Sequence, residues 1–258
     1  MSRWLLWFVG AVGVLLTIGG CAEPECRMPE LVEGRPGEPV VLPTQHHIIG
    51  RSVQNRPIMC QIFGNGPDVV LIMATIHGSE PAGTPLVRKL AHYLEDNKYL
   101  LRGRTVVLMP LANPDGLALQ TRGNANGVDL NRNFSAHNRI NNATNGHSPL
   151  CEPESQVIYD VIHKHKPDRI VSIHQPLACI DYDGPAAGLA GQMARYCTLP
   201  VKKLGGRPGS LGSYAGMTLG IPIITFEMLE SDSQLTAETL WQRYGKALLA
   251  AIVYPDDL

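Results

Sequence analysis

Two histidines and two glutamates stand at the ends of three largely apolar segments of this sequence. His77 and Glu80 follow the first segment, His174 ends the second, and Glu227 ends the third. Two imidazoles and one glutamate carboxylate, with an open position for water, are a common ligand set of catalytic zinc sites. His77, Glu80 and His174 therefore form a candidate site for one zinc ion. Glu227 remains as a candidate general base that takes a proton from an attacking water and passes it to a leaving amine.

The segments that carry these residues are typical of strands buried on both faces of a sheet. Runs of this kind predict four buried strands, at 69–76, 105–111, 169–174 and 221–227. A hairpin is predicted from two further strands, at 46–53 and 56–63. Helical spacing of apolar residues indicates helices over 82–97, 154–165, 184–197 and 235–254.

This alternation predicts an α/β fold, a single domain with a mixed, largely parallel central sheet flanked by helices. Ligands of such sheets bind at the carboxyl ends of the strands, so the four polar side chains are expected to meet at one edge. Two segments, 113–134 and 205–220, have the composition of loops. A long loop inside a compact domain is usually functional.

The first residues indicate export. Arg3 precedes an apolar segment of about 15 residues, which fits a signal peptide over residues 1–20. The sequence Ile18-Gly-Gly-Cys21 resembles a bacterial lipobox, so Cys21 is a candidate lipidation site, followed to residue 43 by a proline-rich linker. The expected location is the cell envelope, as a periplasmic lipoprotein. An outer-membrane anchor is favoured in a Gram-negative cell, since no Asp follows Cys21. An ordinary signal peptide or membrane anchor is the alternative.

The amino-acid composition argues against a disordered chain and against a nucleic-acid-binding protein. Of the 258 residues, 44% are hydrophobic and 17% are charged, which is enough apolar sequence for a sizeable core over residues 44–258. A formal net charge of −1 argues against nucleic acid as a partner. Five cysteines remain if Cys21 carries lipid, and the sequence leaves open whether Cys151 and Cys179 form a bridge or stay free. The oligomeric state is not determined.

Taken together, the motifs resemble those of M14-type zinc carboxypeptidases. They span roughly residues 48–230 and read His77-Gly-Ser-Glu80, Asn113-Pro-Asp-Gly116, Gly127-Val-Asp-Leu-Asn-Arg-Asn-Phe134, His174 and Thr225-Phe-Glu227. Thr121-Arg122-Gly-Asn-Ala and His174-Gln-Pro-Leu-Ala-Cys-Ile-Asp181 are most similar to the murein peptide amidase branch. That branch cleaves the bond between γ-D-glutamate and meso-diaminopimelate in cell-wall peptides.

The resemblance implies roles for three further residues. Arg122 matches the arginine that polarises the scissile carbonyl and stabilises the oxyanion, a suitable task for a permanent positive charge. Asn131 and Arg132 match the pair that grips the substrate's α-carboxylate. A guanidinium group fits a carboxylate through two parallel hydrogen bonds.

Diaminopimelate carries a distal ammonium and a second carboxylate, which need partners of their own. Asp181 is the first candidate for the ammonium, with Asp183 as a substitute, and Arg207 is the candidate for the carboxylate. Digestive carboxypeptidases clamp their substrate with a tyrosine about twenty residues before the catalytic glutamate, and segment 203–207 has none. Tyr214 is the nearest aromatic candidate for substrate contact, and packing under the loop is the alternative role for it.

Three rival functions remain. A carboxypeptidase acting on ordinary peptides shares every catalytic residue, although the missing tyrosine argues against it. A deacylase resembling the succinylglutamate desuccinylases would share the His-x-x-Glu and Asn-Arg pairs, but the fuller run 127–134 argues against it. A non-catalytic envelope-binding lipoprotein would not need Glu227, because binding alone requires no general base.

Overall fold

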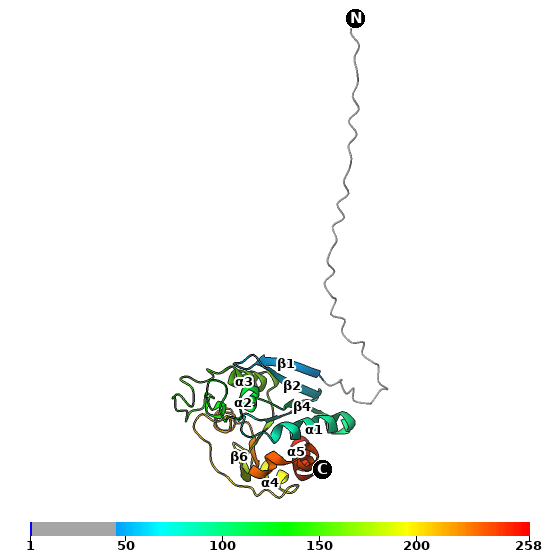
Figure 1. The fold of residues 1–258 in the computed structure, drawn as a ribbon. Helices are drawn as coiled ribbons and strands as arrows, with labels where there is room; N and C mark the ends of the chain where they lie inside the picture. The colour runs from blue at the N-terminus through cyan, green and yellow to red at the C-terminus, as the bar shows by residue number, and fades with distance from the viewer. Residues whose placement is uncertain (2–44) are drawn as a thin grey trace. The chain divides into compact units, whose positions relative to one another are not determined.

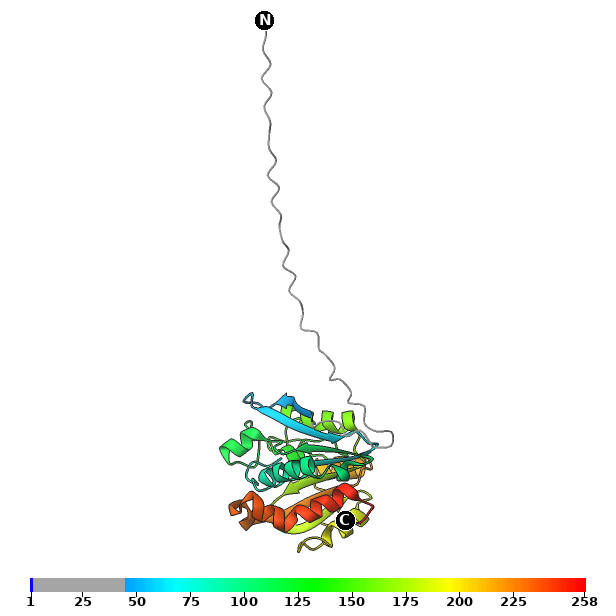
Figure 2. The same cartoon turned by 90° about the vertical axis from the view of Figure 1, so that its right-hand side faces the viewer.

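The computed structural model describes Met1 and residues 45–258 of the chain (Figures 1 and 2). The predicted signal peptide, Cys21 and the linker lie outside the described residues. In the part that is described, the strands form one seven-stranded sheet in the order β1-β2-β4-β3-β5-β7-β6. Their bounds are β1 Gln45–Arg51, β2 Pro57–Gly64, β3 Asp68–Ala74, β4 Arg104–Met109, β5 Arg169–His174, β6 Leu177–Asp183 and β7 Ile223–Leu229.

The four central strands, β4, β3, β5 and β7, are parallel, whereas β1, β2 and β6 pair antiparallel at the two sides. The predicted single α/β domain with a mixed, largely parallel sheet is confirmed. The predicted hairpin is present as β1 and β2, which pair from Arg51 and Pro57 outward.

Helices cover both faces of this sheet. Their bounds are α1 Gly83–Asp96, α2 Pro114–Leu119, α3 Pro153–His165, α4 Ala187–Ala194 and α5 Ala237–Val253, with short helical turns η1 Lys98–Leu101, η2 Leu130–Arg132, η3 Ser213–Thr218 and η4 Glu230–Gln234. Helices α1, α4 and α5 pack into one apolar core on one face, and α3 packs into a second core on the other. Figure 2 shows α1 and α5 side by side in front of the sheet.

Strand β6, helix α2 and the turns η2 and η3 differ from the sequence prediction. Strand β6 was not predicted, because Leu177–Asp183 follows a proline and contains two aspartates, both uncommon in strands. Helix α2 and the turns η2 and η3 lie in segments predicted as loops. No helix among the described residues is long and apolar enough to cross a bilayer.

The thiols of Cys151 and Cys179 are free, so the bridge considered between them does not form.

A buried arginine fixes the last helix against the centre of the sheet. Arg169, at the start of β5, is 4% exposed and forms a two-pronged ion pair with Asp68 of β3. The same guanidinium donates to the carbonyls of Ala251 and Ile252 in the last turn of α5, both at 2.6 Å. Carbonyls at a helix C-terminus lack partners within the helix, so a cation satisfies them and opposes the helix dipole.

A second buried charge fixes the tip of the β1–β2 hairpin. Asp115 of α2 is fully buried and accepts hydrogen bonds from the Ser52 hydroxyl at 2.7 Å, the Gln54 backbone N–H at 2.8 Å and the Arg56 guanidinium at 2.6 Å. Burial alone raises the pKa of the Asp115 carboxyl, but these donors outweigh it and hold the pKa below its ordinary value. The ionised carboxylate thus couples the hairpin to the loop that follows β4.

Replacing this carboxylate should destabilise the fold. We expect Asp115→Asn to lower the free energy of unfolding by about 1–3 kcal/mol at neutral pH, because an amide cannot accept all three donors. The contribution of a carboxyl with a depressed pKa is present above its ordinary value of about 3.9 and is lost as the pH falls through the folded-state pKa. Urea denaturation at several pH values should therefore show the gap between wild type and variant closing in acid. The exposed Asp160→Asn substitution is the control, and equal stability of both variants at neutral pH would contradict this account.

Candidate metal and catalytic site

A polar cavity of about 470 Å³ opens where the carboxyl ends of β3, β5 and β7 meet. Ala74 pairs with Ile173 across β3 and β5, and His174 pairs with Glu227 across β5 and β7. His77 and Glu80 lie on the turn that leaves β3. The parallel register therefore gathers all four predicted residues around one cavity, as the sequence predicted.

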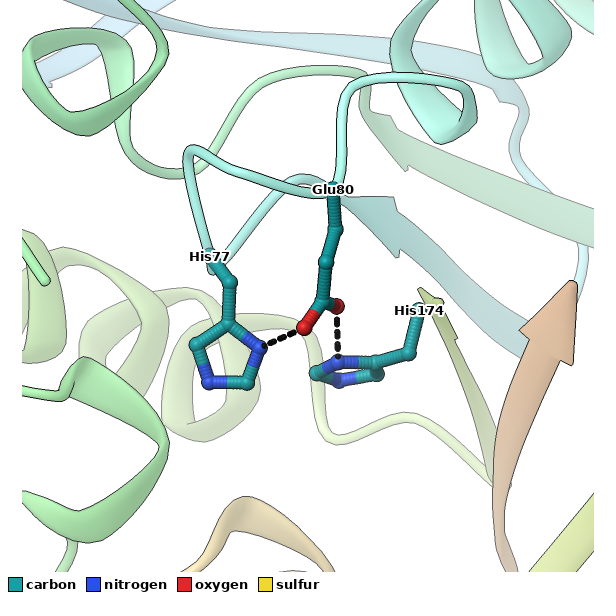
Figure 3. A group of neighbouring side chains, drawn as sticks. All are labelled: His77, Glu80 and His174. Carbon is teal, nitrogen blue, oxygen red and sulfur yellow. Dashed lines mark hydrogen bonds and ion pairs between the residues drawn. The ribbon is translucent and has the colours of Figure 1, made fainter. Parts of the chain in front are cut away.

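The two imidazoles share the carboxylate of Glu80 (Figure 3). Nδ1 of His77 lies 2.8 Å from one oxygen of Glu80, and Nδ1 of His174 lies 2.9 Å from the other. The ring centroids are 4.9 Å apart, and one donor atom from each of the three residues falls within 4.8 Å of the others. All three side chains are buried. The donor atoms converge as the ligands of a single ion do.

The opposite nitrogen of each ring has a partner that fixes its orientation. Nε2 of His77 lies 3.0 Å from Asp129, and Nε2 of His174 lies 3.0 Å from the Ser172 hydroxyl. Metal-binding histidines usually donate their second N–H to such a group, which leaves the other nitrogen unprotonated toward the metal. The donor set and its orientation fit zinc, with Nδ1 of each histidine directed into the site.

The charges at this cluster are strongly coupled. Burial alone raises the pKa of Glu80 and Asp129, but hydrogen bonds from the imidazoles reverse this and hold both pKa values well below their ordinary range. Burial alone lowers the pKa of His77, and the carboxylates of Asp129 and Glu80 raise it above its ordinary value. The cluster therefore attracts positive charge, which a metal cation would supply in place of a proton.

Asp129 was missed as a site residue, although it lies in the quoted run 127–134. Besides His77, it accepts from Nε of Arg122 at 2.9 Å and from the backbone N–H of Asn131 at 2.9 Å. Arg122 also donates to Glu80 at 3.0 Å, with its side chain about half exposed. The sequence could have indicated this role, because an acidic residue close to an Asn-Arg pair can orient the side chains around it. The structure places the Arg122 guanidinium directly beside the candidate metal ligands.

The segment around Arg122 is anchored by a buried amide. Asn124 is 2% exposed and donates to Glu152 at 2.7 Å and to Glu154 at 2.9 Å. The other oxygen of Glu154 accepts the backbone N–H of Val53 at the hairpin tip. Segment 121–134 is thereby tied to α3 and to the hairpin. These anchors were not predicted, since polar residues so far apart in the chain give no local pattern.

Glu227 lines the cavity next to the candidate metal ligands. One carboxylate oxygen accepts the backbone N–H of Leu177 at 3.3 Å, and the side chain is 7% exposed. Burial raises the pKa of Glu227 above its ordinary value, while the nearby His174 opposes this effect. A carboxyl with a raised pKa is suited to accept a proton and then give it up.

Asn131, Arg132 and Arg207 line the same cavity. The Asn131 amide oxygen accepts the backbone N–H of Leu211 at 2.8 Å, which leaves its NH₂ group as a donor. Arg207 is exposed at the rim. The predicted substrate-binding residues for carboxylates thus line one cavity with the candidate metal ligands.

Asp181 and Asp183 also line the cavity, from the same face of β6. One oxygen of Asp181 accepts the backbone N–H of Leu204 at 2.8 Å and so holds the loop above it. Asp183 is 6% exposed, and its carboxylate forms no hydrogen bond with a described residue. Burial and the neighbouring Asp181 raise its pKa, and the positive charge of Lys203 opposes this effect. A Cβ at Gly212 would come within 2.2 Å of Oδ2 of Asp183, so glycine leaves the room that this carboxylate occupies.

Of the two roles considered for Tyr214, the structure shows packing in the core and no contact with the cavity. Tyr214 is 4% exposed, does not line the cavity, and packs between Phe134 and Tyr159. Its hydroxyl lies 2.8 Å from Nε2 of His163, on the side of α3. The π-helical turn η3 directs the ring into the core, and nothing in the sequence marked that turn.

Comparison with known proteins identifies the family. The zinc carboxypeptidase family, peptidase M14, matches residues 43–182. Murein peptide amidase A from Escherichia coli K12 is 36% identical over 212 residues, covering 73% of this chain and 83% of that protein. The crystal structure of murein-tripeptide amidase from Escherichia coli O157 aligns with a TM-score of 0.62 at 28% identity, covering 87% of this chain and 98% of that chain. The chain belongs to the M14 zinc carboxypeptidase family and is a metallopeptidase.

The fold extends further than this sequence similarity. Carboxypeptidase A from Helicoverpa armigera aligns with a TM-score of 0.69 at 20% identity, covering 82% of this chain and 69% of that chain. At this identity the likeness shows the shared fold. The prediction of an M14-type chain most similar to murein peptide amidases is confirmed.

The partner of His77 should control metal affinity. We expect Asp129→Asn to weaken zinc binding by roughly 10- to 100-fold, because an amide neither orients the imidazole nor balances its charge as a carboxylate does. Competition against a fluorescent zinc chelator measures this. Asp181→Asn, which removes a carboxylate of the same cavity that contacts neither histidine, should leave zinc affinity unchanged. Equal affinities for wild type and Asp129→Asn would contradict the assignment.

Proposed function

We propose that this enzyme hydrolyses the bond between γ-D-glutamate and meso-diaminopimelate in murein peptides, with one zinc ion held by His77, Glu80 and His174. The observation that carries the proposal is the composition of the cavity. Beside the candidate metal ligands it holds arginines for carboxylates and a buried carboxylate, Asp183, for an ammonium. The similarity to murein peptide amidases supports the same substrate class.

Zinc, when bound, supplies the Lewis acid that activates water and polarises the scissile carbonyl. The protein's side chains transfer the proton and stabilise the developing negative charge. Glu227 takes a proton from the attacking water and delivers it to the departing amine of diaminopimelate. Arg122 lies beside the metal ligands and stabilises the negative charge that develops on the carbonyl oxygen. Its contacts with Glu80 and Asp129 hold the guanidinium in position before substrate arrives.

The remaining polar groups hold the leaving residue. Asn131 and Arg132 bind the α-carboxylate of diaminopimelate, and Arg207 at the rim binds its distal carboxylate. Asp183 pairs with the distal ammonium. The sequence prediction placed Asp181 first. We now place Asp183 first, because the Asp181 carboxylate already accepts a backbone N–H whereas the Asp183 carboxylate forms no hydrogen bond with a described residue.

An ordinary carboxypeptidase shares the catalytic residues, so the other groups of the cavity must distinguish the two functions. The burial of Tyr214 leaves the described part of the cavity without a tyrosine that could clamp a C-terminal protein residue. A buried carboxylate without a partner would also disfavour apolar side chains in the cavity. Both features support a charged, zwitterionic leaving residue.

For location we propose export and lipid attachment at Cys21, with the enzyme held in the cell envelope. The support is the sequence pattern Ile18-Gly-Gly-Cys21 after an apolar segment. Metabolic labelling with a radioactive fatty acid tests it. Label should enter the wild-type chain and be absent from Cys21→Ser, and equal labelling of both would refute lipidation at this residue.

The proposed proton carrier gives a sharp test. Glu227→Gln should reduce kcat by roughly 10²- to 10⁴-fold on the murein tripeptide, because the amide cannot accept a proton. Zinc content should be unchanged, since Glu227 is not among the proposed ligands. Glu230→Gln, an exposed neighbour on the same segment, serves as the control. Wild-type turnover by Glu227→Gln with full zinc content would remove Glu227 from the mechanism.

Specificity tests the role of Asp183. We compare kcat/KM on γ-D-glutamyl-diaminopimelate with that on the analogue whose leaving residue lacks the distal amine. Asp183→Asn should reduce the preference for diaminopimelate by about 10- to 100-fold, which corresponds to ~1.4–3 kcal/mol. Asp181→Asn should change it less. An unchanged ratio in Asp183→Asn would show that the ammonium binds elsewhere.

A further inference from the structure

A second cavity, of about 690 Å³, lies on the α1 and α5 side of the sheet and shares no lining residue with the catalytic cavity. Four aromatic side chains line it: Tyr93, Tyr99, Tyr196 and Trp241. Trp241 is the one tryptophan of residues 45–258, and no phenylalanine lines the cavity. Aromatic residues with a polar tip suit a ligand that is apolar on one side and polar on another.

The aromatic wall is held in place by the protein core. Tyr93, Tyr196 and Trp241 are partly buried and pack on the core between α1, α4 and α5. The rings of Tyr93 and Trp241 have centroids 4.9 Å apart at an angle of 43°. Tyr99 stands at the opening with 58% of its surface exposed. The three rings that pack on the core lose little conformational freedom when a ligand binds.

A polar stripe of α5 forms the other side of the cavity. Glu238, Gln242 and Lys246 are four residues apart, and so they lie on one face of the helix. They are a carboxylate, an amide and an ammonium. Glu238 forms an ion pair with Lys89 at 2.9 Å and accepts a hydrogen bond from the Gln242 amide at 3.3 Å, so its charge is already balanced within the protein. An anionic membrane or a nucleic acid would require a basic excess. A purely apolar partner would bury these groups without hydrogen bonds, which is costly.

We propose that this cavity binds a pyranose ring of an uncharged, N-acetylated amino sugar, the class of sugar that carries murein peptides. The C–H face of such a ring is apolar and would lie on Tyr99 and Trp241. Its hydroxyl and acetamido groups are donors and acceptors for the Gln242 amide and the Lys246 ammonium. The choice of amino sugar rests on the proposed murein substrate, whereas the cavity itself is separate from the catalytic residues. Sugar binding there would hold the enzyme on glycan strands without taking part in hydrolysis.

The test uses Trp241 as the reporter. In the full chain carrying Trp4→Phe and Trp7→Phe, Trp241 is the sole tryptophan. Titration with tetra-N-acetylchitotetraose should produce a saturable change in its fluorescence. Adding Tyr99→Ala with Gln242→Ala should weaken the apparent affinity by about tenfold or more. Ile48→Ala, which truncates a comparably exposed side chain outside this cavity, should leave it unchanged.

Several outcomes would overturn the proposal. One is a fluorescence change that does not saturate, and another is an affinity that Tyr99→Ala with Gln242→Ala leaves unaltered. A response to anionic phospholipid vesicles with none to the oligosaccharide would instead assign the cavity to a lipid surface. Hydrolysis of free murein tripeptide, measured on the same samples, should equal that of wild type. Loss of sugar binding with full hydrolysis refutes only this proposal, and sugar binding without tripeptide hydrolysis refutes only the proposed catalytic function.

Discussion

The burial of the Glu80 carboxylate is the constraint on which the site depends. This side chain is 6% exposed, so its charge requires donors from the protein. Four polar groups contact it: Nδ1 of each of the two imidazoles, which binds it through a shared proton or a metal cation, the Arg122 guanidinium at 3.0 Å and the backbone N–H of Gln175 at 3.1 Å. These groups come from three separate parts of the chain, so meeting the needs of one carboxylate brings the β3 turn, the end of β5 and the long loop together. The same convergence produces a site that attracts a metal cation.

The sheet makes this convergence possible. Pairing of β3 with β5 and of β5 with β7 sets His174 opposite Glu227 and near the turn that carries His77. Because side chains alternate between faces, a slip of one residue in either pairing would send one of these groups to the opposite face. Arg169 helps to hold the register, since it joins the starts of β3 and β5 to the end of α5. The ion pair of Arg169 at the amino ends of the strands thus helps to keep the candidate catalytic residues aligned at the carboxyl ends.

Much of this arrangement could be predicted from the sequence, for identifiable reasons. The central strands are continuous apolar runs, and the polar residues that end them stand out against that background. The loop residues Arg122, Asn131 and Arg132 followed from resemblance to a family rather than from any local pattern. Strand β6 could not be predicted, because its aspartates serve the cavity at the expense of strand propensity. The burial of Tyr214 and the partners of Asp129 depend on contacts between distant segments, which periodicity does not reveal.

The central claim is that the buried His-Glu-His cluster and its charged cavity make a zinc amidase of murein peptides. Turnover of the purified full chain on L-alanyl-γ-D-glutamyl-meso-diaminopimelate tests it most directly, before and after zinc is removed with a chelator and then restored. The account predicts release of free diaminopimelate that stops on chelation and returns with zinc. Absence of release by the zinc-loaded enzyme, together with hydrolysis of ordinary C-terminal peptide bonds, would contradict the substrate assignment and retain the metallopeptidase. Release that persists without zinc would contradict the role of the metal cluster itself.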